Sequence, residues 1–269
     1  MTISLENKVV VVTGGAARIG RAIALECADS GASVAITFNH SEAEAQQTLA
    51  DLRARSTLSS QRFAAIQCDV SSSSDNLKLQ NEVLRRFGKA TALVNNAAIF
   101  RRTPFELTEY SDWENSFDEH IAANLKGPYL LSKLFGDLFV AQKHGCIVNI
   151  ADIHGQRALK TYAAYCISKA GVLTLTETMA KALAPHVRVN AICPGTILLP
   201  SEDQCGGDQS GEDQVGGEFA GTARDLINRV PLARLGTPEE IAQSVVFLIG
   251  GPQFISGAVL AVDGAERLR

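Results

Sequence analysis

The sequence predicts a single α/β domain in which helices cover both faces of a parallel, doubly wound sheet. Short runs rich in β-branched residues alternate with helical stretches along nearly the whole chain, and this alternation implies right-handed crossovers between parallel strands. The predicted strands are apolar throughout, as is typical of strands buried on both faces. A chain of 269 residues can bury one large core. We therefore expect one domain over residues 1–269, without an internal repeat.

The first half of the chain contains four predicted strands with a helical pattern in each gap. The strands cover residues 9–13, 33–38, 63–68 and 92–95, and the helices cover residues 19–29, 42–55 and 76–87. Each assignment depends on the change from a short apolar run to helical spacing of apolar residues.

The second half continues the same alternation. It contains a long helical pattern around residues 113–140, a strand over 146–151, a helix over 162–184, a strand over 188–193, helices over 222–229 and 238–249, and a last strand over 258–262. The total is seven strands in one sheet. Residues 200–221 interrupt the pattern: they are acidic, rich in glycine and without hydrophobic periodicity, which predicts a flexible loop.

Composition and charge exclude several kinds of partner. The 25 basic and 29 acidic residues give a net charge of −4, so no basic field favours nucleic acid. No apolar run reaches membrane-spanning length and the N-terminus lacks the order of a signal peptide, so we expect a cytoplasmic protein without a membrane partner. The six cysteines form no Cys-x-x-Cys pair, which predicts buried thiols rather than disulfides or metal ligands.

A Tyr-x-x-x-Lys spacing marks the candidate catalytic group. Tyr165 and Lys169 fall one turn apart on one face of the predicted helix 162–184. An ammonium there favours phenolate over phenol, which would lower the pKa of the tyrosine toward the range of a proton-transfer catalyst. Asp152 precedes this pair, at the end of the strand over 146–151.

This arrangement resembles the catalytic core of the short-chain dehydrogenase/reductase family, which usually has a serine where Asp152 stands. An aspartate at that position resembles one branch, the bacterial pteridine reductases, as do His154, Arg157 and the run from Pro194 to Pro200. The resemblance covers about residues 7–264. It implies a Rossmann-type, dinucleotide-binding catalytic domain.

The resemblance places the pyrophosphate of the cofactor at a glycine-rich turn after the first strand. Glycines let the backbone approach the phosphates, and the following helix offers its N–H groups; the candidate contacts are Gly14, Arg18, Ile19 and Gly20. Arg18 replaces a glycine of the usual family pattern, as it does in pteridine reductases. A non-glycine residue there is expected to have an ordinary φ and to place its guanidinium beside bound phosphate.

The end of the second strand favours NADPH over NADH. An NAD enzyme needs a carboxylate here to accept hydrogen bonds from the ribose, and that carboxylate would repel a 2′-phosphate. The chain has Asn39, His40 and Ser41 at this point and no acid before Glu42. We therefore expect Arg18, His40 and Ser41 to hold the 2′-phosphate.

Three further segments match the family in order. They resemble the residues beside the adenine amino group, the turn that supports the adenosine, and the segment beside the nicotinamide carboxamide. These residues are Asp69 and Val70, Asn96 and Ala97, and the segment Pro194, Gly195 and Thr196. The family has a substrate-covering loop after the last segment, so residues 200–221 are either a mobile lid or a solvated surface loop.

Two more residues complete the predicted site by resemblance. Asn124 matches the asparagine that interrupts a long helix and holds a water beside the lysine. Phe100 matches the aromatic side chain that sandwiches a pterin against the nicotinamide; packing in the core is the alternative for this residue. Ala98 departs from the branch, which commonly has a serine there.

Asp152 predicts a substrate rich in ring N–H groups. A carboxylate only accepts hydrogen bonds, and it would disfavour the oxyanion that develops when a ketone is reduced. The predicted function is therefore NADPH-dependent reduction of dihydropterins to tetrahydropterins, with dihydrofolate as a further candidate. Asp152, Tyr165, Lys169 and Asn124 form the catalytic set, Tyr165 gives the proton, and Arg18 and Phe100 also contact the pterin.

Two other functions stay open: a short-chain reductase of another carbonyl or imine, and an inactive NADP-binding regulatory protein. No metal is expected. The helices around 113–140 and over 162–184 are apolar over much of their circumference. The family uses these helices for dimer contacts and usually forms tetramers, which implies a homotetramer.

Overall fold

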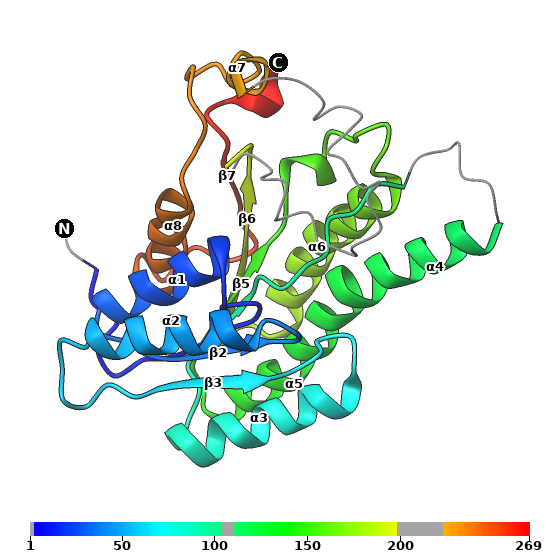
Figure 1. Ribbon diagram of the computed structural model, residues 1–269. Coiled ribbons are helices and arrows are strands. Elements are labelled where there is room, and N and C mark those ends of the chain that lie inside the picture. Colours follow the sequence, from blue (N-terminus) through cyan, green and yellow to red (C-terminus); the bar gives the residue numbers. More distant parts are fainter. Residues whose placement is uncertain (1–2, 104–109, 198–222) are drawn as a thin grey trace.

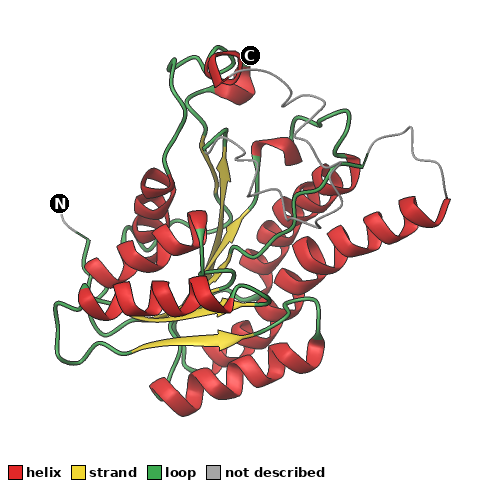
Figure 2. Ribbon diagram, in the orientation of Figure 1, coloured by secondary structure: helices red, strands yellow, loops and turns green. Residues whose placement is uncertain are grey.

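The computed structural model describes residues 3–103, 110–197 and 223–269, and these form one seven-stranded sheet with helices on both faces (Figures 1 and 2). Every neighbouring pair of strands is parallel, and the strand order is β3-β2-β1-β4-β5-β6-β7. The strands are β1 (Val9–Val12), β2 (Ser33–Phe38), β3 (Phe63–Gln67), β4 (Ala92–Asn95), β5 (Gly145–Ile150), β6 (Val187–Pro194) and β7 (Val259–Val262). The predicted fold class is confirmed.

The helices form one layer on each face of the sheet (Figure 1). On one face, α1 (Arg18–Asp29), α2 (Glu42–Ala54) and α8 (Pro238–Gly250) close over one hydrophobic cluster. On the other face, α3 (Ser73–Phe87), α5 (Gly127–Ala141) and α6 (Ala163–Ala182) close over a second. The strands are apolar on both sides because both layers bury them.

Shorter elements complete the chain. They are α4 (Tyr110–Ile121), the short α7 (Ala223–Ile227), and two 3₁₀ turns, η2 (Ile153–Gly155) and η4 (Glu266–Leu268). Within the described parts, no helix is long and apolar enough to cross a membrane. The predicted flexible loop 200–221 lies outside the described residues.

The predicted helix around 113–140 is two α-helices joined by a π-helical turn. The turn, η1 (Ala122–Lys126), lies between α4 and α5 and contains Asn124. The prediction that Asn124 interrupts a long helix is confirmed. The π turn covers only five residues, which is too short a segment for hydrophobic spacing to distinguish it from an α-helix.

The strand order brings the predicted site residues to one edge of the sheet. The chain adds β2 and β3 on one side of β1 and then returns to add β4 to β7 on its other side. Ligands of open α/β sheets bind at such a switch point, beyond the carboxyl ends of the strands. Gly14, Asn96, Asp152 and Gly195 stand one or two residues after the ends of β1, β4, β5 and β6. Residues far apart in sequence therefore line the same edge.

Candidate active site

Tyr165 and Asp152 are in direct contact. The Tyr165 hydroxyl donates a hydrogen bond of 2.6 Å to Oδ2 of Asp152. Tyr165 lies in the first turn of α6, and Asp152 follows β5 as the N-cap of η2, where its Oδ1 accepts the N–H of His154 at 2.8 Å. One carboxylate oxygen of Asp152 therefore binds the backbone N–H of His154, while the other faces the phenol of Tyr165.

Lys169 lies one turn further along α6, at the back of the tyrosine. Its Nζ is 5.7 Å from the centre of the Tyr165 ring and donates to the carbonyl oxygen of Ile150 at 2.8 Å. Burial and the nearby Asp152 carboxylate raise the pKa of Tyr165 well above its usual value. The prediction that this pKa is lowered is wrong here, because burial and the Asp152 carboxylate both disfavour the phenolate. Tyr165 is accordingly held as a protonated donor.

Asn124 secures the segment that follows β4. Its Oδ1 accepts the N–H of Ile99 at 2.8 Å, and its Nδ2 donates to the carbonyl of Ile99 at 2.9 Å and to Oγ of Ser168 at 3.1 Å. These bonds tie the π turn to the chain beside Phe100 and to α6. The link from Asn124 through water to Lys169 stays a prediction.

Phe100 lies at the site and not in the core. Its ring is 39% exposed, stacks on Tyr162 with centroids 4.4 Å apart, and meets the Tyr165 ring edge-on at 4.7 Å. Thr103 holds this segment by donating its N–H to the carbonyl of Thr161 at 2.8 Å. The core-packing alternative is therefore set aside. The stacking of Tyr162 on one face of Phe100 was not predicted, because spacing in sequence does not show it.

The glycine-rich turn is locked to the end of β4. The Asn96 side chain donates to the carbonyls of Thr13 and Gly14 at 2.9 and 3.1 Å, and Oγ1 of Thr13 accepts the N–H groups of Asn96 and Ala97. A Cβ at Gly20 would lie 2.1 Å from the Gly14 carbonyl oxygen, so only glycine fits there. Sequence reasoning missed Thr13, whose signal is a polar residue at the end of an apolar strand.

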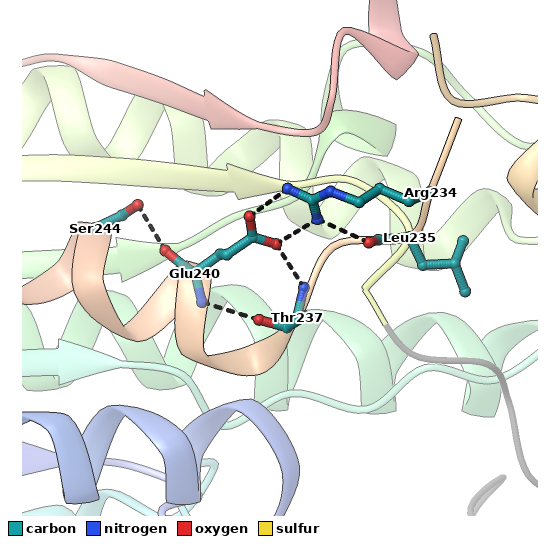
Figure 3. A network of polar contacts seen from close by, with 5 residues as sticks. All are labelled: Arg234, Leu235, Thr237, Glu240 and Ser244. Atoms are coloured by element: carbon teal, nitrogen blue, oxygen red, sulfur yellow. Dashed lines mark hydrogen bonds and ion pairs between the residues drawn. The ribbon is translucent and has the colours of Figure 1, made fainter. Parts of the chain in front are cut away.

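The helix that starts at this turn fits an anion. Ala17, the N-cap of α1, supplies no side-chain acceptor, and uncapped N-terminal N–H groups attract phosphate. The start of α8 differs (Figure 3): Thr237 and Glu240 cap each other reciprocally, and Arg234 pairs with Glu240. The pyrophosphate of a dinucleotide would therefore find its partners at α1, beside Gly14 and Gly20.

Comparison with known proteins agrees with this geometry. Residues 14–265 match a family model described as enoyl-(acyl carrier protein) reductase. The chain is 32% identical over 264 residues to 3-oxoacyl-[acyl-carrier-protein] reductase of Synechocystis, covering 97% of both chains. The chain belongs to the short-chain dehydrogenase/reductase family. It is thus an NAD(P)-dependent oxidoreductase.

Two further family members match over almost their whole lengths. One is 2-(S)-hydroxypropyl-CoM dehydrogenase 3 of Xanthobacter autotrophicus, 35% identical, with 98% of each chain covered. The other is the solved structure of NAD⁺-bound xylitol dehydrogenase, with a TM-score of 0.82, 29% identity, and coverage of 96% of this chain and 98% of that one. These names differ in substrate, so membership of the family does not by itself identify the substrate of this chain.

Arg18 departs from its predicted conformation in this short-chain dehydrogenase/reductase. Its φ is +51°, in the left-handed region, whereas an ordinary φ was expected. The turn itself requires this value, which explains why the family pattern has glycine there. A left-handed residue other than glycine costs about 1–2 kcal/mol. Backbone strain of this kind is kept where it serves a function, and the exposed guanidinium of Arg18 is the group that would serve one.

We predict that Arg18→Gly reduces the preference for NADPH over NADH by about ten- to a hundredfold, the effect of one charge-assisted hydrogen bond. Relief of strain should leave the free energy of unfolding unchanged or up to about 1 kcal/mol higher. Arg18→Ala is the matched control, since it loses the charge but keeps the strain. Equal turnover of the parent enzyme with both cofactors would contradict this prediction.

The remaining predicted cofactor residues lie at the same sheet edge. His40 and Ser41 are exposed after β2, and the Ser41 side chain does not cap α2. Asp69 is half-buried, and its Oδ1 accepts the N–H and hydroxyl of Ser71 at 2.9 and 2.7 Å. Val70 follows Asp69 after β3, Ile19 is the second residue of α1, and Pro194 and Gly195 stand at the end of β6. Among the described residues, no cluster of His, Cys, Asp or Glu could hold a metal ion.

Lys169 should make stability depend on pH in the alkaline range. Burial lowers the pKa of Lys169 from 10.5 to about 8, although Asp152 opposes the shift. Between these values Lys169 binds more protons in the unfolded chain than in the folded one, so Lys169 itself contributes a rise in the free energy of unfolding from about pH 8 to 10.5. Buried thiols such as Cys27 and Cys146, whose pKa values burial raises above 9.0, contribute a fall in the upper part of this range. Denaturant unfolding of the cofactor-free protein across this range measures the slope. The slope of the parent minus the slope of Lys169→Met isolates the Lys169 contribution and should be positive. Lys181→Met, in the exposed part of α6, should keep the parent slope; an unchanged slope in Lys169→Met as well would refute the assignment.

Proposed function

We propose that this protein is an NADPH-dependent pteridine reductase that converts dihydropterins to tetrahydropterins, with dihydrofolate as a second substrate. The observation that carries the proposal is the Asp152 carboxylate 2.6 Å from the Tyr165 hydroxyl. A carboxylate at that point can accept hydrogen bonds from amino and ring N–H groups but cannot donate one to a ketone oxygen.

The proposed cofactor contacts follow the sheet edge. The turn from Gly14 to Gly20 and the start of α1 would hold the pyrophosphate, and Arg18, His40 and Ser41 the 2′-phosphate. NADPH, when bound, supplies the hydride for a ring carbon of the pterin. Lys169 would hold the nicotinamide ribose.

Tyr165 would supply the proton. Its raised pKa keeps the phenol protonated at neutral pH, so it can give that proton to the ring nitrogen as the adjacent carbon is reduced. The phenolate left behind lies near the Asp152 carboxylate, which disfavours it, while Lys169 offsets this charge and solvent returns a proton. The Tyr165 hydroxyl must turn from Asp152 to the substrate, which an incoming N–H group bonded to the carboxylate would permit.

Phe100 supports a flat heteroaromatic substrate. It is partly exposed, and Tyr162 backs one of its faces. A ring stacked against Phe100 would lie beside Tyr165, because the two side chains are in edge-on contact. Neither contact requires a carbonyl on the substrate.

The test is NADPH oxidation with dihydrobiopterin, dihydromonapterin and dihydrofolate, beside a panel of ketones that includes a 3-oxoacyl thioester. We expect turnover of at least one pterin and little of the ketones. Ketone turnover without pterin turnover would favour a carbonyl reductase. Binding of NADPH without any turnover would favour the regulatory alternative, which the contact of Tyr165 with Asp152 and the nearby Lys169 argue against.

The proposal includes a cytoplasmic homotetramer. Aromatic and aliphatic side chains remain exposed on α4, α5 and α6, such as Trp113 at 45%, Tyr129 at 48% and Ile167 at 52%, and a partner copy would cover them. We predict a tetramer by light scattering at micromolar concentration. A monomer under those conditions would contradict it.

A further inference from the structure

Glu266, three residues before the last residue of the sequence, is a buried carboxylate to which sequence reasoning gave no role. It lies in η4 and is 6% exposed. Its Oε2 accepts the N–H of Thr196 at 2.8 Å, and its Oε1 accepts the hydroxyl of Thr196 at 3.0 Å. One carboxylate thus binds both hydrogen-bond donors of one threonine.

Thr196 lies where the reacting ring of the cofactor must be. It follows β6, the neighbour of β5, and Asp152 at the end of β5 contacts the proton donor Tyr165. The glycine-rich turn at β1 fixes the other end of the dinucleotide, so its nicotinamide must extend toward β5 and β6 to reach the proton donor. Thr196 is half-buried, and the carboxamide is the polar substituent of that ring.

The contact with Glu266 decides whether the Thr196 hydroxyl can donate or accept a hydrogen bond toward a ligand. Because a carboxylate can only accept, Glu266 takes both the N–H and the hydroxyl hydrogen of Thr196. The lone pairs of Oγ1 are then what Thr196 can present to a ligand. We propose that Glu266 is a positioning residue that makes Thr196 an acceptor for the N–H₂ group of the nicotinamide carboxamide.

Glu266 is itself held in place from two sides. Nη1 of Arg157, on the segment that begins at Asp152, donates to its backbone carbonyl at 3.1 Å. A Cβ on Gly195 would lie 2.8 Å from its Oε2, so the close approach requires glycine. The C-terminal turn therefore joins the Asp152 segment to the Thr196 segment.

The test compares the binding of three ligands by titration calorimetry. NADP⁺ has the carboxamide, its 3-acetylpyridine analogue has a carbonyl without an N–H group, and 2′-phospho-ADP-ribose has no nicotinamide ring. We expect the parent protein to bind NADP⁺ about three- to tenfold more tightly than the acetylpyridine analogue, the effect of one neutral hydrogen bond. NADP⁺ and its acetylpyridine analogue share the same adenosine half, so the ratio of their affinities does not depend on the NADPH preference or on the pterin proposal.

Glu266→Gln should remove the difference in affinity between NADP⁺ and its acetylpyridine analogue. The glutamine amide would donate to Oγ1 of Thr196 and turn the hydroxyl hydrogen toward the ligand, while binding of 2′-phospho-ADP-ribose stays unchanged. Thr196→Val should abolish the ratio as well, Thr196→Ser should preserve it, and Glu266→Gln in the valine background should add nothing further.

Two results would overturn the proposal. One is a Glu266→Gln protein that keeps the parent ratio. The other is an equal loss of affinity for all three ligands, which would mean that Glu266 only stabilises the fold. Should the glutamine variant fail to fold, the valine and serine variants decide the outcome, because a parent ratio in Thr196→Val would also refute it.

Discussion

Tyr165→Phe should reduce turnover by at least about a hundredfold, since a positioned general acid typically accelerates a reaction by about 10²- to 10⁴-fold. The substitution removes the donor hydroxyl and almost no volume. Burial and Asp152 hold the Tyr165 phenol protonated, so this hydroxyl is the group ready to supply the proton. NADPH affinity, measured by fluorescence titration, should change little.

Tyr110→Phe is the control, because it removes the same hydroxyl from a side chain that is 77% exposed. Substantial activity in the Tyr165→Phe protein would transfer the role of proton source to another group. Asp152 or a solvent molecule would then be the next candidate.

Asp152→Ser should reduce pterin turnover by about ten- to a hundredfold, the value of one charge-assisted hydrogen bond to the substrate. A serine restores a hydroxyl donor and removes the negative charge near a developing oxyanion, so any trace reduction of ketones should rise. The pKa of Tyr165 should also fall, because the carboxylate is one of the two main causes that raise it.

The measurement is the ratio of pterin to ketone turnover in the parent and the variant. NADPH affinity is the internal control and should stay constant. A serine variant that reduces pterins as well as the parent would remove the main physical support for the pteridine proposal.

The order of the elements could be predicted from the sequence because it depends on local patterns. Apolar runs mark strands, helical spacing marks helices, and their alternation leaves one common sheet topology. Tyr165 and Lys169 share a helix face for the same local reason. The turn around Gly14 was predictable because a strand, glycines and a helix start follow one another in the chain.

Contacts between distant segments were decided only by the tertiary structure. The pKa of Tyr165 depends on its burial and on the 2.6 Å approach of Asp152 from another element, so the spacing from Tyr165 to Lys169 predicted the wrong direction. The left-handed φ of Arg18 follows from a turn that the end of β4 locks.

The pairing of Glu266 with Thr196 joins residues 70 positions apart. The sequence by itself therefore determined the sheet, the helices and the residue types at the site, because these depend on neighbours in the chain. Packing alone decided protonation, backbone strain and hydrogen-bond polarity, because these depend on distances and burial created when β5, β6 and α6 come together.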